Sequence, residues 1–294
     1  MSEKTLRFAI FGNEYQAKKS VAMQKIIALL QQYNAKIYVD RPFYEFLTNQ
    51  QHLELSVTGI FDGDDFDADF AVSMGGDGTL LRTASRVGIK NIPIIGVNIG
   101  RLGFLADVNP VEVERAVAAI YSGKYSVKEH SVIELITDSG KRVTYPYALN
   151  DIAVLKRDSA SMISIHASVN SEYIMTYQAD GLIVTTPTGS TAYSLSNGGP
   201  IIEPDTNILC ITPVAPHSLN VRPIVVSDSS VITLKVESRS HSFLVAIDGR
   251  SVSFPEGTLV TIKKADYTVK VVRFSERRYF ATLREKMMWG LDQR

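Results

Sequence analysis

An apolar run that ends in a glycine-rich turn constrains the fold of this chain more than any other feature. Residues 70–74 are apolar and bounded, as in a buried strand, and residues 79–87 repeat apolar side chains at the spacing of a helix face. The sequence Gly-Gly-Asp-Gly lies between them. Glycines permit positive φ and let a ligand approach the backbone amides, and amides at a helix N-terminus favour anions. We therefore expect a phosphate loop made of Gly75, Gly76, Gly78 and Thr79.

Asp77 is the single carboxylate in this loop. It would repel a phosphate unless it binds a cation or accepts a proton from a hydroxyl that is about to be phosphorylated. The alternative is that Asp77 is a helix N-cap in an ordinary tight turn. Neither Gly-x-x-x-x-Gly-Lys-Ser/Thr nor Gly-x-Gly-x-x-Gly occurs in the sequence, which excludes a standard P-loop and a standard dinucleotide fingerprint.

The composition is that of a globular protein of about two domains. Of the 294 residues, 45% are hydrophobic and 21% are charged, with 31 Lys and Arg against 31 Asp and Glu. This balance gives no electrostatic reason to expect a nucleic acid or a membrane as a partner. The single cysteine, Cys210, excludes an intrachain disulfide and fits a reducing cytosol. Neither a run of about 18 apolar residues nor a signal peptide is visible, so we expect a cytoplasmic protein without a transmembrane helix.

Expected strands and helices alternate in the first part of the chain, which predicts a Rossmann-like parallel sheet covered by helices. The strands are expected at residues 6–11, 35–39, 70–74 and 92–97, and the helices at residues 17–33, 42–47, 79–87 and 110–121. The acidic run from Asp62 to Asp69 should be a solvated loop. The loop at 98–107 should lie beside the first glycine loop, because ligands bind at the carboxyl ends of parallel strands. Candidate pocket residues there are Asn98, Arg101 and Phe104, unless the loop is merely a structural turn.

From Tyr125 onward, alternation of polar and apolar residues replaces the helical spacing, which predicts a second, all-β domain, a sandwich or a barrel. The alternation is clearest at residues 131–137, 163–169, 231–236 and 267–272. A final helix carries Tyr279, Leu283 and Met287 on one face, and we expect it to return to the first domain and bury that face there. The expected domains are an α/β domain of residues 1–123 and 277–294 and a β-sandwich-like domain of residues 124–276.

Two polar segments interrupt the expected β domain. Asn150 and Asp151 pair an amide with a carboxylate after an apolar stretch, and residues 180–200 collect hydroxyls, glycines and one tyrosine. Such a run offers many donors and acceptors to ribose hydroxyls and phosphates, and Tyr193 is available to stack on a base. The alternative is an ordinary Ser/Thr-rich loop.

Taken together, these motifs resemble those of the NAD kinase family. They are Gly75-Gly-Asp-Gly-Thr79, Gly96-Val-Asn-Ile-Gly-Arg-Leu-Gly-Phe104, Asn150-Asp151, and the run from Asp180-Gly through Thr188-Gly-Ser-Thr-Ala-Tyr193 to Gly198-Gly-Pro200. The resemblance covers nearly the whole chain, whereas Gly-Gly-Asp-Gly alone is shared with lipid kinases and, approximately, with phosphofructokinases. It implies an α/β domain, a β domain, and transfer of the γ-phosphate of ATP to the 2′-hydroxyl of the adenosine ribose of NAD, which gives NADP.

The resemblance also implies roles for particular residues. Asp77 is then the proton acceptor and the catalytic residue. The residues implied to hold the adenosine ribose and base are Asp77, Gly78, Asn150 and Asp151. The rest of the implied NAD site consists of Arg82, Phe104, Asp180, Thr191, Ala192, Tyr193, Ser194, Leu195, Ser196 and Ala215. Some relatives have other residues at Leu105, Gln178 and Arg250, and by this mapping none of the three touches the chemistry.

No cluster of His, Cys and Glu has metal-ligand spacing, so we expect the divalent cation, Mg²⁺ or Mn²⁺, to arrive on ATP. The family implies a homodimer or a homotetramer. We expect the five histidines to be structural, with His217 near Ala215 as the exception, and Cys210 to be a core residue. Two alternatives stay open: a lipid kinase of the same superfamily, against which the hydroxyl-rich run argues, and a sensor that binds NAD or NADP without catalysis, which the intact Asp77 weakens.

Overall fold

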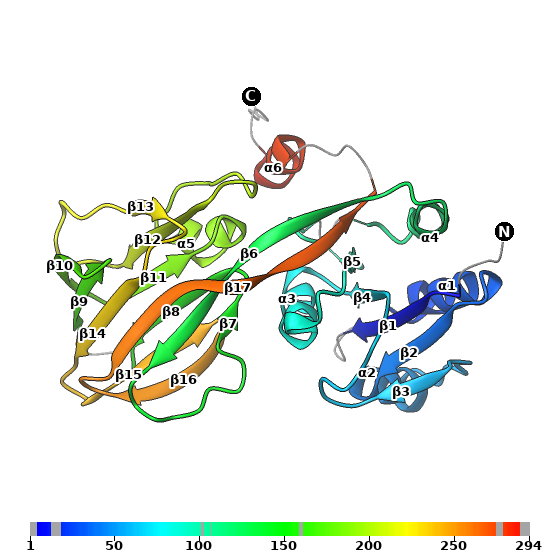
Figure 1. Ribbon diagram of the computed structural model, residues 1–294, viewed down its shortest axis with the longest axis horizontal. Helices are drawn as coiled ribbons and strands as arrows, with labels where there is room; N and C mark the ends of the chain where they lie inside the picture. Colours follow the sequence, from blue (N-terminus) through cyan, green and yellow to red (C-terminus); the bar gives the residue numbers. More distant parts are fainter. Residues whose placement is uncertain are drawn as a thin grey trace. The chain divides into compact units, whose positions relative to one another are not determined.

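The computed structural model describes residues 5–12, 19–100, 103–106, 108–158, 161–274 and 279–288. The chain divides into two compact units, unit 1 of Met1–Glu129 and Val269–Arg294, and unit 2 of His130–Thr268. It leaves unit 1 in strand β6 (Ser126–Thr137) and returns in strand β17 (Leu259–Arg273) (Figure 1). None of the helices in the described ranges is long and apolar enough to cross a membrane.

Unit 1 is built on a parallel sheet in the order β5-β4-β1-β2-β3. The strands are β1 (Arg7–Gly12), β2 (Lys36–Asp40), β3 (Gly59–Phe61), β4 (Phe70–Met74) and β5 (Ile94–Val97). The end of β17 joins this sheet beside β5, where Val271 pairs with Ile94. Every residue of β4 and β5 is buried, as is usual for central parallel strands that are covered on both faces.

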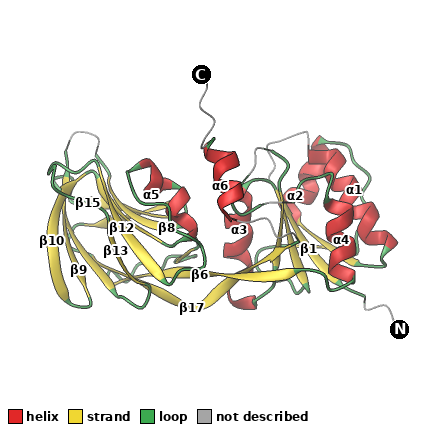
Figure 2. Cartoon of the chain, turned by 90° about the horizontal axis from the view of Figure 1, so that it is seen from above, coloured by secondary structure: helices red, strands yellow, loops and turns green. Residues whose placement is uncertain are grey.

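Helices cover both faces of this sheet. They are α1 (Lys19–Gln32), α2 (Arg41–Glu45), which continues into a π-helical turn η1 (Phe46–Gln50), α3 (Asp77–Val87) with a 3-10 turn η2 (Gly88–Lys90), α4 (Val113–Tyr121) and α6 (Tyr279–Met287). Figure 2 shows α1 and α4 on one side of the sheet and α3 on the other. The side chains of Leu30 and Val117 pack with Phe8 and Val72 of the strands in one apolar core. Unit 1 therefore confirms the expected parallel α/β domain.

Unit 2 consists of two antiparallel sheets around a second core. The first contains β10 (Glu172–Ala179), β9 (Ile163–Val169), β14 (Ile232–Glu237) and β17, with β6 beside β17 and β7 (Tyr147–Ala148) beside β6. The second contains β13 (Ile224–Ser227), β12 (Ile208–Val214), β11 (Gly181–Thr185), β8 (Asp151–Lys156), β15 (Ser242–Ile247) and β16 (Arg250–Pro255). Two short turns, η3 (Thr188–Thr191) and α5 (Tyr193–Ser196), follow β11. The inward residues of both sheets, such as Leu234 and Val154, share one buried cluster, so the sandwich is confirmed.

The last helix returns to unit 1, as expected from the sequence. Leu283 on α6 is 2% exposed, and the ring of Tyr279 lies 6.4 Å from that of Phe104. Burial of this face explains why a short helix is stable at this position.

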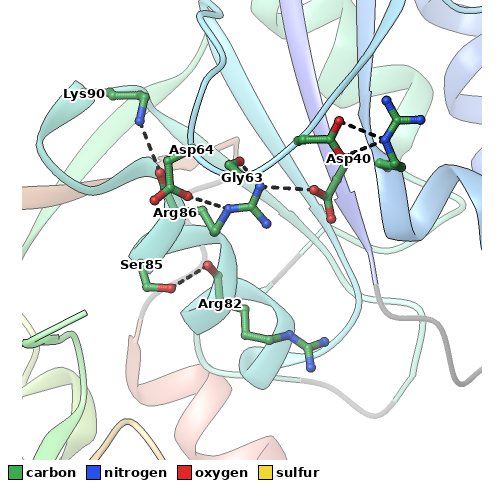
Figure 3. Close-up of polar contacts among 9 residues, drawn as sticks. Asp40, Gly63, Asp64, Arg82, Ser85, Arg86 and Lys90 are labelled. Carbon is green, nitrogen blue, oxygen red and sulfur yellow. Dashed lines mark hydrogen bonds and ion pairs between the residues drawn. The ribbon is translucent and has the colours of Figure 1, made fainter. Parts of the chain in front are cut away.

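The acidic run after β3 is a loop with exposed carboxylates, as its charge pattern predicts, but several of these carboxylates form ion pairs. Arg7 pairs with Asp67 and Asp69, and Arg41 pairs with Asp62 at 2.7 Å. Arg86 of α3 binds Asp64 at 2.6 Å, Asp40 at 3.2 Å and the carbonyl oxygen of Gly63 (Figure 3). The carboxylates therefore attach the loop to β1, α2 and α3, which a count of like charges along the sequence could not reveal.

Candidate active site

The glycine-rich loop places three backbone amides at the start of α3. Gly76 occupies the N-cap position and Asp77 is the first helical residue, so the N-cap alternative for Asp77 is wrong. The first helical hydrogen bond runs from Thr79 N to Gly76 O at 3.0 Å. The amides of Gly76, Asp77 and Gly78 precede it and have no acceptor within α3, which makes them available to an anion.

The glycines of this loop let other atoms come close to the backbone, and they are not needed for an unusual backbone conformation. A Cβ at Gly76 or Gly78 would have no heavy atom within 4 Å, so both amides are open to a ligand. A Cβ at Gly75 would lie 2.1 Å from Oγ1 of Thr79, which requires glycine there. None of the three has positive φ, so that part of the sequence argument is wrong.

The carboxylate of Asp77 accepts hydrogen bonds from three consecutive amides of the neighbouring loop. The donors are the amides of Phe104 at 2.8 Å, Leu105 at 3.0 Å and Ala106 at 3.2 Å. Gly103 permits this approach, because a Cβ there would lie 2.1 Å from Oδ1 of Asp77. The loop that follows β5 therefore lies beside the loop that follows β4, as the parallel sheet predicts.

Other side chains of unit 1 complete the surroundings of Asp77. Lys286 of α6 places Nζ 3.5 Å from Oδ2 of Asp77 and 4.1 Å from the centre of the Phe104 ring. Arg273 donates to the carbonyl oxygens of Leu105 and Phe104, both at 3.4 Å. Asn98 is 3% exposed and its Oδ1 accepts the amide of the turn residue Gly100 at 2.9 Å, whereas Arg101 lies outside the described residues.

Arg82 is an exposed side chain on α3, one turn after the loop. Figure 3 shows it pointing away from the cluster around Arg86. The two arginines therefore differ, since Arg86 is held by carboxylates and Arg82 extends from the helix without an ion pair among the described residues.

In unit 2, the carboxylate of Asp248 organises the turn that leads into β8. It accepts the amides of Leu149 at 2.9 Å, Asn150 at 2.8 Å and Asp151 at 3.1 Å. Burial, and then the charge of Asp248, raises the pKa of Asp151 to about 7. Burial also raises the pKa of Asp248, although the three amides and Arg250 act in the opposite direction. Oδ1 of Asn150 is buried without a partner among the described residues, so a ligand donor could satisfy it.

The hydroxyl-rich run is folded onto this turn and is not a loose Ser/Thr-rich loop. Thr185 donates to the carbonyl oxygen of Asn150 at 3.0 Å, and Thr186 donates to that of Leu149 at 2.6 Å. Oγ of Ser194 lies 2.8 Å from that of Thr212, within the buried region. These hydroxyls are therefore used inside the protein, which the sequence alone did not indicate.

Further along the same run, several side chains stay accessible. Tyr193 is 40% exposed, Ser196 is exposed, and the neighbouring side chains Thr191, Ala192 and Leu195 are half-buried. Tyr193 therefore has the accessible ring that stacking on a base requires.

Asp180 and Ala215 lie at the same edge of unit 2. The amide of Asp180 donates to the carbonyl oxygen of Val214 at 3.0 Å, which places Ala215 next to it. Oδ1 of Asp180 pairs with Nζ of Lys156 at 2.7 Å, and Ala215 is exposed. His217 follows and is exposed, with its amide bonded to the carbonyl oxygen of Gln178 at 2.8 Å.

The sequence analysis missed Asp248 and Lys286. Asp248 had a usable signal, because Asp248-Gly249 repeats the Asp-Gly pair of Asp77-Gly78 and Asp180-Gly181. Lys286 had no such signal in the sequence. Basic residues are common in the last turn of a helix because they interact favourably with the helix dipole.

In the part of the chain that the structure describes, a helix N-terminus with amides open to an anion lies beside glycines that allow close approach and beside a carboxylate. This is the arrangement of a nucleotide-dependent phosphotransferase. The family model described as the ATP-NAD kinase N-terminal domain matches residues 8–125, and that of the ATP-NAD kinase C-terminal domain matches residues 149–274. The chain therefore belongs to the NAD kinase family.

Related proteins are similar over almost the whole chain. An NAD kinase of Bacteroides fragilis is 56% identical over 289 residues, which are 98% of this chain and 100% of the relative. An NAD kinase of Porphyromonas gingivalis is 41% identical over 284 residues, which are 97% of this chain and 98% of the relative.

Two solved structures share the fold. The crystal structure of an NAD kinase from Archaeoglobus fulgidus in complex with ATP has a TM-score of 0.75 at 28% identity and covers 96% of this chain and 99% of that chain. The crystal structure of yeast NADH kinase complexed with NADH has a TM-score of 0.88 at 23% identity. The match covers 99% of this chain and 89% of that chain. The second likeness bears on the fold alone.

Proposed function

We propose that this chain phosphorylates NAD with ATP to give NADP, by transfer of the γ-phosphate to the 2′-hydroxyl of the adenosine ribose. The observation that carries this proposal is the carboxylate of Asp77 beside the first amides of α3, which have no backbone acceptor among the described residues. Membership of the NAD kinase family names the two substrates.

Phosphoryl transfer depends mostly on positioning and on neutralising charge, because its transition state is loose. A carboxylate is far too weak a base to ionise a ribose hydroxyl outright. Asp77 therefore orients the 2′-hydroxyl and takes its proton late in the reaction, a role worth about 10²–10⁴-fold. The amides of Gly76 and Gly78 bind the phosphates of ATP, in a phosphate loop that Gly75 and Thr79 complete.

A second set of residues binds NAD, and Gly78 belongs to this set as well as to the phosphate loop. In unit 1 they are Gly78, Arg82 and Phe104, and in unit 2 they are Asn150, Asp151, Asp180, Thr191, Ala192, Tyr193, Ser194, Leu195, Ser196 and Ala215. The buried Oδ1 of Asn150 and the exposed ring of Tyr193 support this assignment, because each provides a contact that an adenosine can satisfy. In domain terms, residues 1–123 and 277–294 carry the phosphate loop and residues 124–276 carry most of the dinucleotide site.

The divalent cation, Mg²⁺ or Mn²⁺, belongs to the ATP substrate in this proposal. Among the described residues no three His, Cys, Asp or Glu side chains gather as metal ligands. Mg²⁺ commonly binds through substrate phosphates and one or two carboxylates, which is the arrangement expected of a cation that arrives with ATP. We further propose a cytoplasmic homodimer or homotetramer. Light scattering on the purified protein tests the oligomeric state.

A coupled assay tests the function. Purified protein, ATP, Mg²⁺ and NAD are mixed, and an NADP-specific dehydrogenase reports NADP, for the wild type, Asp77→Asn and the control Asp65→Asn. Asp65 is an exposed carboxylate in the loop after β3, so its change should leave turnover within twofold. We expect NADP from the wild type and a loss of about 10²-fold or more in Asp77→Asn.

Binding and folding are measured beside turnover, because the new amide would turn an N–H₂ group toward backbone donors. Circular dichroism and titration with NAD establish that Asp77→Asn is folded and binds. If neither protein makes NADP while both bind NAD, the kinase proposal is wrong and the sensor replaces it. Normal turnover in a folded Asp77→Asn would remove the proton-accepting role.

A further inference from the structure

The last turn of α6 brings a lysine to Asp77. Leu283 is 2% exposed and holds the helix on unit 1, and Lys286 follows on the same face. The side chain of Lys286 is 29% exposed, and Nζ lies 3.5 Å from Oδ2 of Asp77. It also lies 4.1 Å from the centre of the Phe104 ring, in a cation–π contact. Two separate contacts therefore join this ammonium group to residues that the proposed function places at NAD.

The carboxylate of Asp77 can accept few hydrogen bonds beyond those that it already accepts in the protein. An ionised carboxylate accepts about four hydrogen bonds, and three amides already use three of them. Two of the three amides bind Oδ1 and one binds Oδ2, so the free position for an acceptor bond is on Oδ2, where Lys286 lies. A 2′-hydroxyl that approaches Asp77 must therefore take the position where the ammonium group now points.

The ammonium group keeps donors for another acceptor. It has three N–H bonds, and the contacts with Asp77 and with the face of Phe104 use at most two of them. An oxygen of a phosphoryl group beside Asp77 is an acceptor of the right charge, and a flexible lysine side chain follows it with small rotations.

We propose that Lys286 is a further catalytic residue, which contacts the phosphoryl group during its transfer and neutralises its charge. This inference rests on the proposed function. In the reaction the 2′-oxygen forms a bond to the γ-phosphorus while the bond from that phosphorus to the bridging oxygen breaks. ADP leaves with the electron pair, and the hydroxyl proton goes to Asp77. Lys286 neither gains nor loses a proton, and its pairing with Asp77 is its position before NAD binds.

The test compares Lys286→Met with Arg284→Met in the coupled assay. Arg284 lies on the same helix, is exposed, and has no ion pair among the described residues, so its change removes one charge without touching Asp77. We expect Lys286→Met to lower kcat about 10²-fold, with KM for NAD within threefold, because the contact is made to the group in transfer. Arg284→Met should stay within twofold of the wild type.

Two results would overturn the proposal. One is a kcat within twofold of the wild type in Lys286→Met, and the other is a raised KM for NAD with kcat unchanged, which would make Lys286 a binding residue. If the wild type forms no NADP, the proposed function fails instead, and the two failures are thereby distinguished.

Chemical rescue separates lost charge from altered folding. Alkylation of Lys286→Cys with 2-bromoethylamine rebuilds a side chain of lysine length that ends in an ammonium group. The native Cys210 should not react, because it is buried and burial raises the pKa of its thiol. We expect kcat to recover at least tenfold on alkylation. No recovery after mass spectrometry has shown complete alkylation would also overturn the proposal, even if Lys286→Met fails to fold.

Discussion

Asp151 is a buried residue at the start of β8, 7% exposed, and the charge of the half-buried Asp248 acts on its carboxyl group. Its pKa of about 7 lies well above the ordinary value of 3.8 for an aspartic acid, because burial penalises the charged form. The folded state therefore binds a proton that the unfolded state has already lost between these two pH values. This raised pKa stabilises the fold below about pH 4, and that contribution is lost as the pH rises to about 7.

The change Asp151→Asn should remove this pH dependence. We expect the variant to gain stability relative to the wild type between pH 5 and pH 8, by roughly 1–4 kcal/mol, because it buries no charge at high pH. Urea denaturation at several pH values measures the difference. A difference that stays constant over this range would contradict the prediction, and Asp65→Asn serves as the exposed control.

At the scale of elements, Arg86 attaches the end of α3 to the rest of unit 1. Its guanidinium group contacts Asp40, Asp64 and the carbonyl oxygen of Gly63, and lies 5.5 Å from the centre of the Phe11 ring (Figure 3). The opposite end of the same helix begins at the phosphate loop, so these contacts also fix the direction in which its amides point.

Arg86→Met should therefore lower the stability of the fold by about 1–3 kcal/mol, because the buried carboxylate of Asp40 loses a cation. The matched control is Arg82→Met on the same helix, which should change the free energy of unfolding by less than about 0.5 kcal/mol. Thermal or urea denaturation compares the two variants. Equal losses of unfolding free energy in the two variants would show that the ion pairs of Arg86 do not stabilise the fold.

Sequence reasoning works best for elements whose signal is local. β4 and α3 were predicted nearly to the residue, because an apolar run, a glycine turn and a helical spacing follow one another directly. β11 is not predicted as a strand, because its short apolar stretch from Leu182 to Val184 lies at the start of the hydroxyl-rich run 180–200. β8 is likewise not predicted, although the apolar residues from Ile152 to Leu155 follow Asp151 directly.

The residues of the candidate site also fall into two groups, those that a local motif indicates and those that only tertiary contacts bring to the site. Asp77 could be found from a motif of a few adjacent residues, and so could Asn150. Asp248 and Lys286 contact these residues from far along the chain, so only tertiary structure brings them together. Their roles could not be derived from spacing, because spacing describes neighbours in sequence and not partners across a fold.

At the scale of the molecule, the two units have separate apolar cores. Ile10 of β1 and Ile211 of β12 are each fully buried, one in each core. We expect Ile10→Ala and Ile211→Ala each to cost about 2–5 kcal/mol and to speed hydrogen exchange chiefly in the unit that carries the change. Exchange that quickens equally in both units would show that they unfold as one body.

Because the chain passes into unit 2 through β6 and returns to unit 1 through β17, the two units are completed at different times during synthesis. A ribosome makes His130–Thr268 before it makes the end of β17 and α6, so unit 2 has all its residues while unit 1 still lacks Arg273 and Lys286. The proposed phosphate-contacting lysine is thus added after every residue proposed to bind NAD.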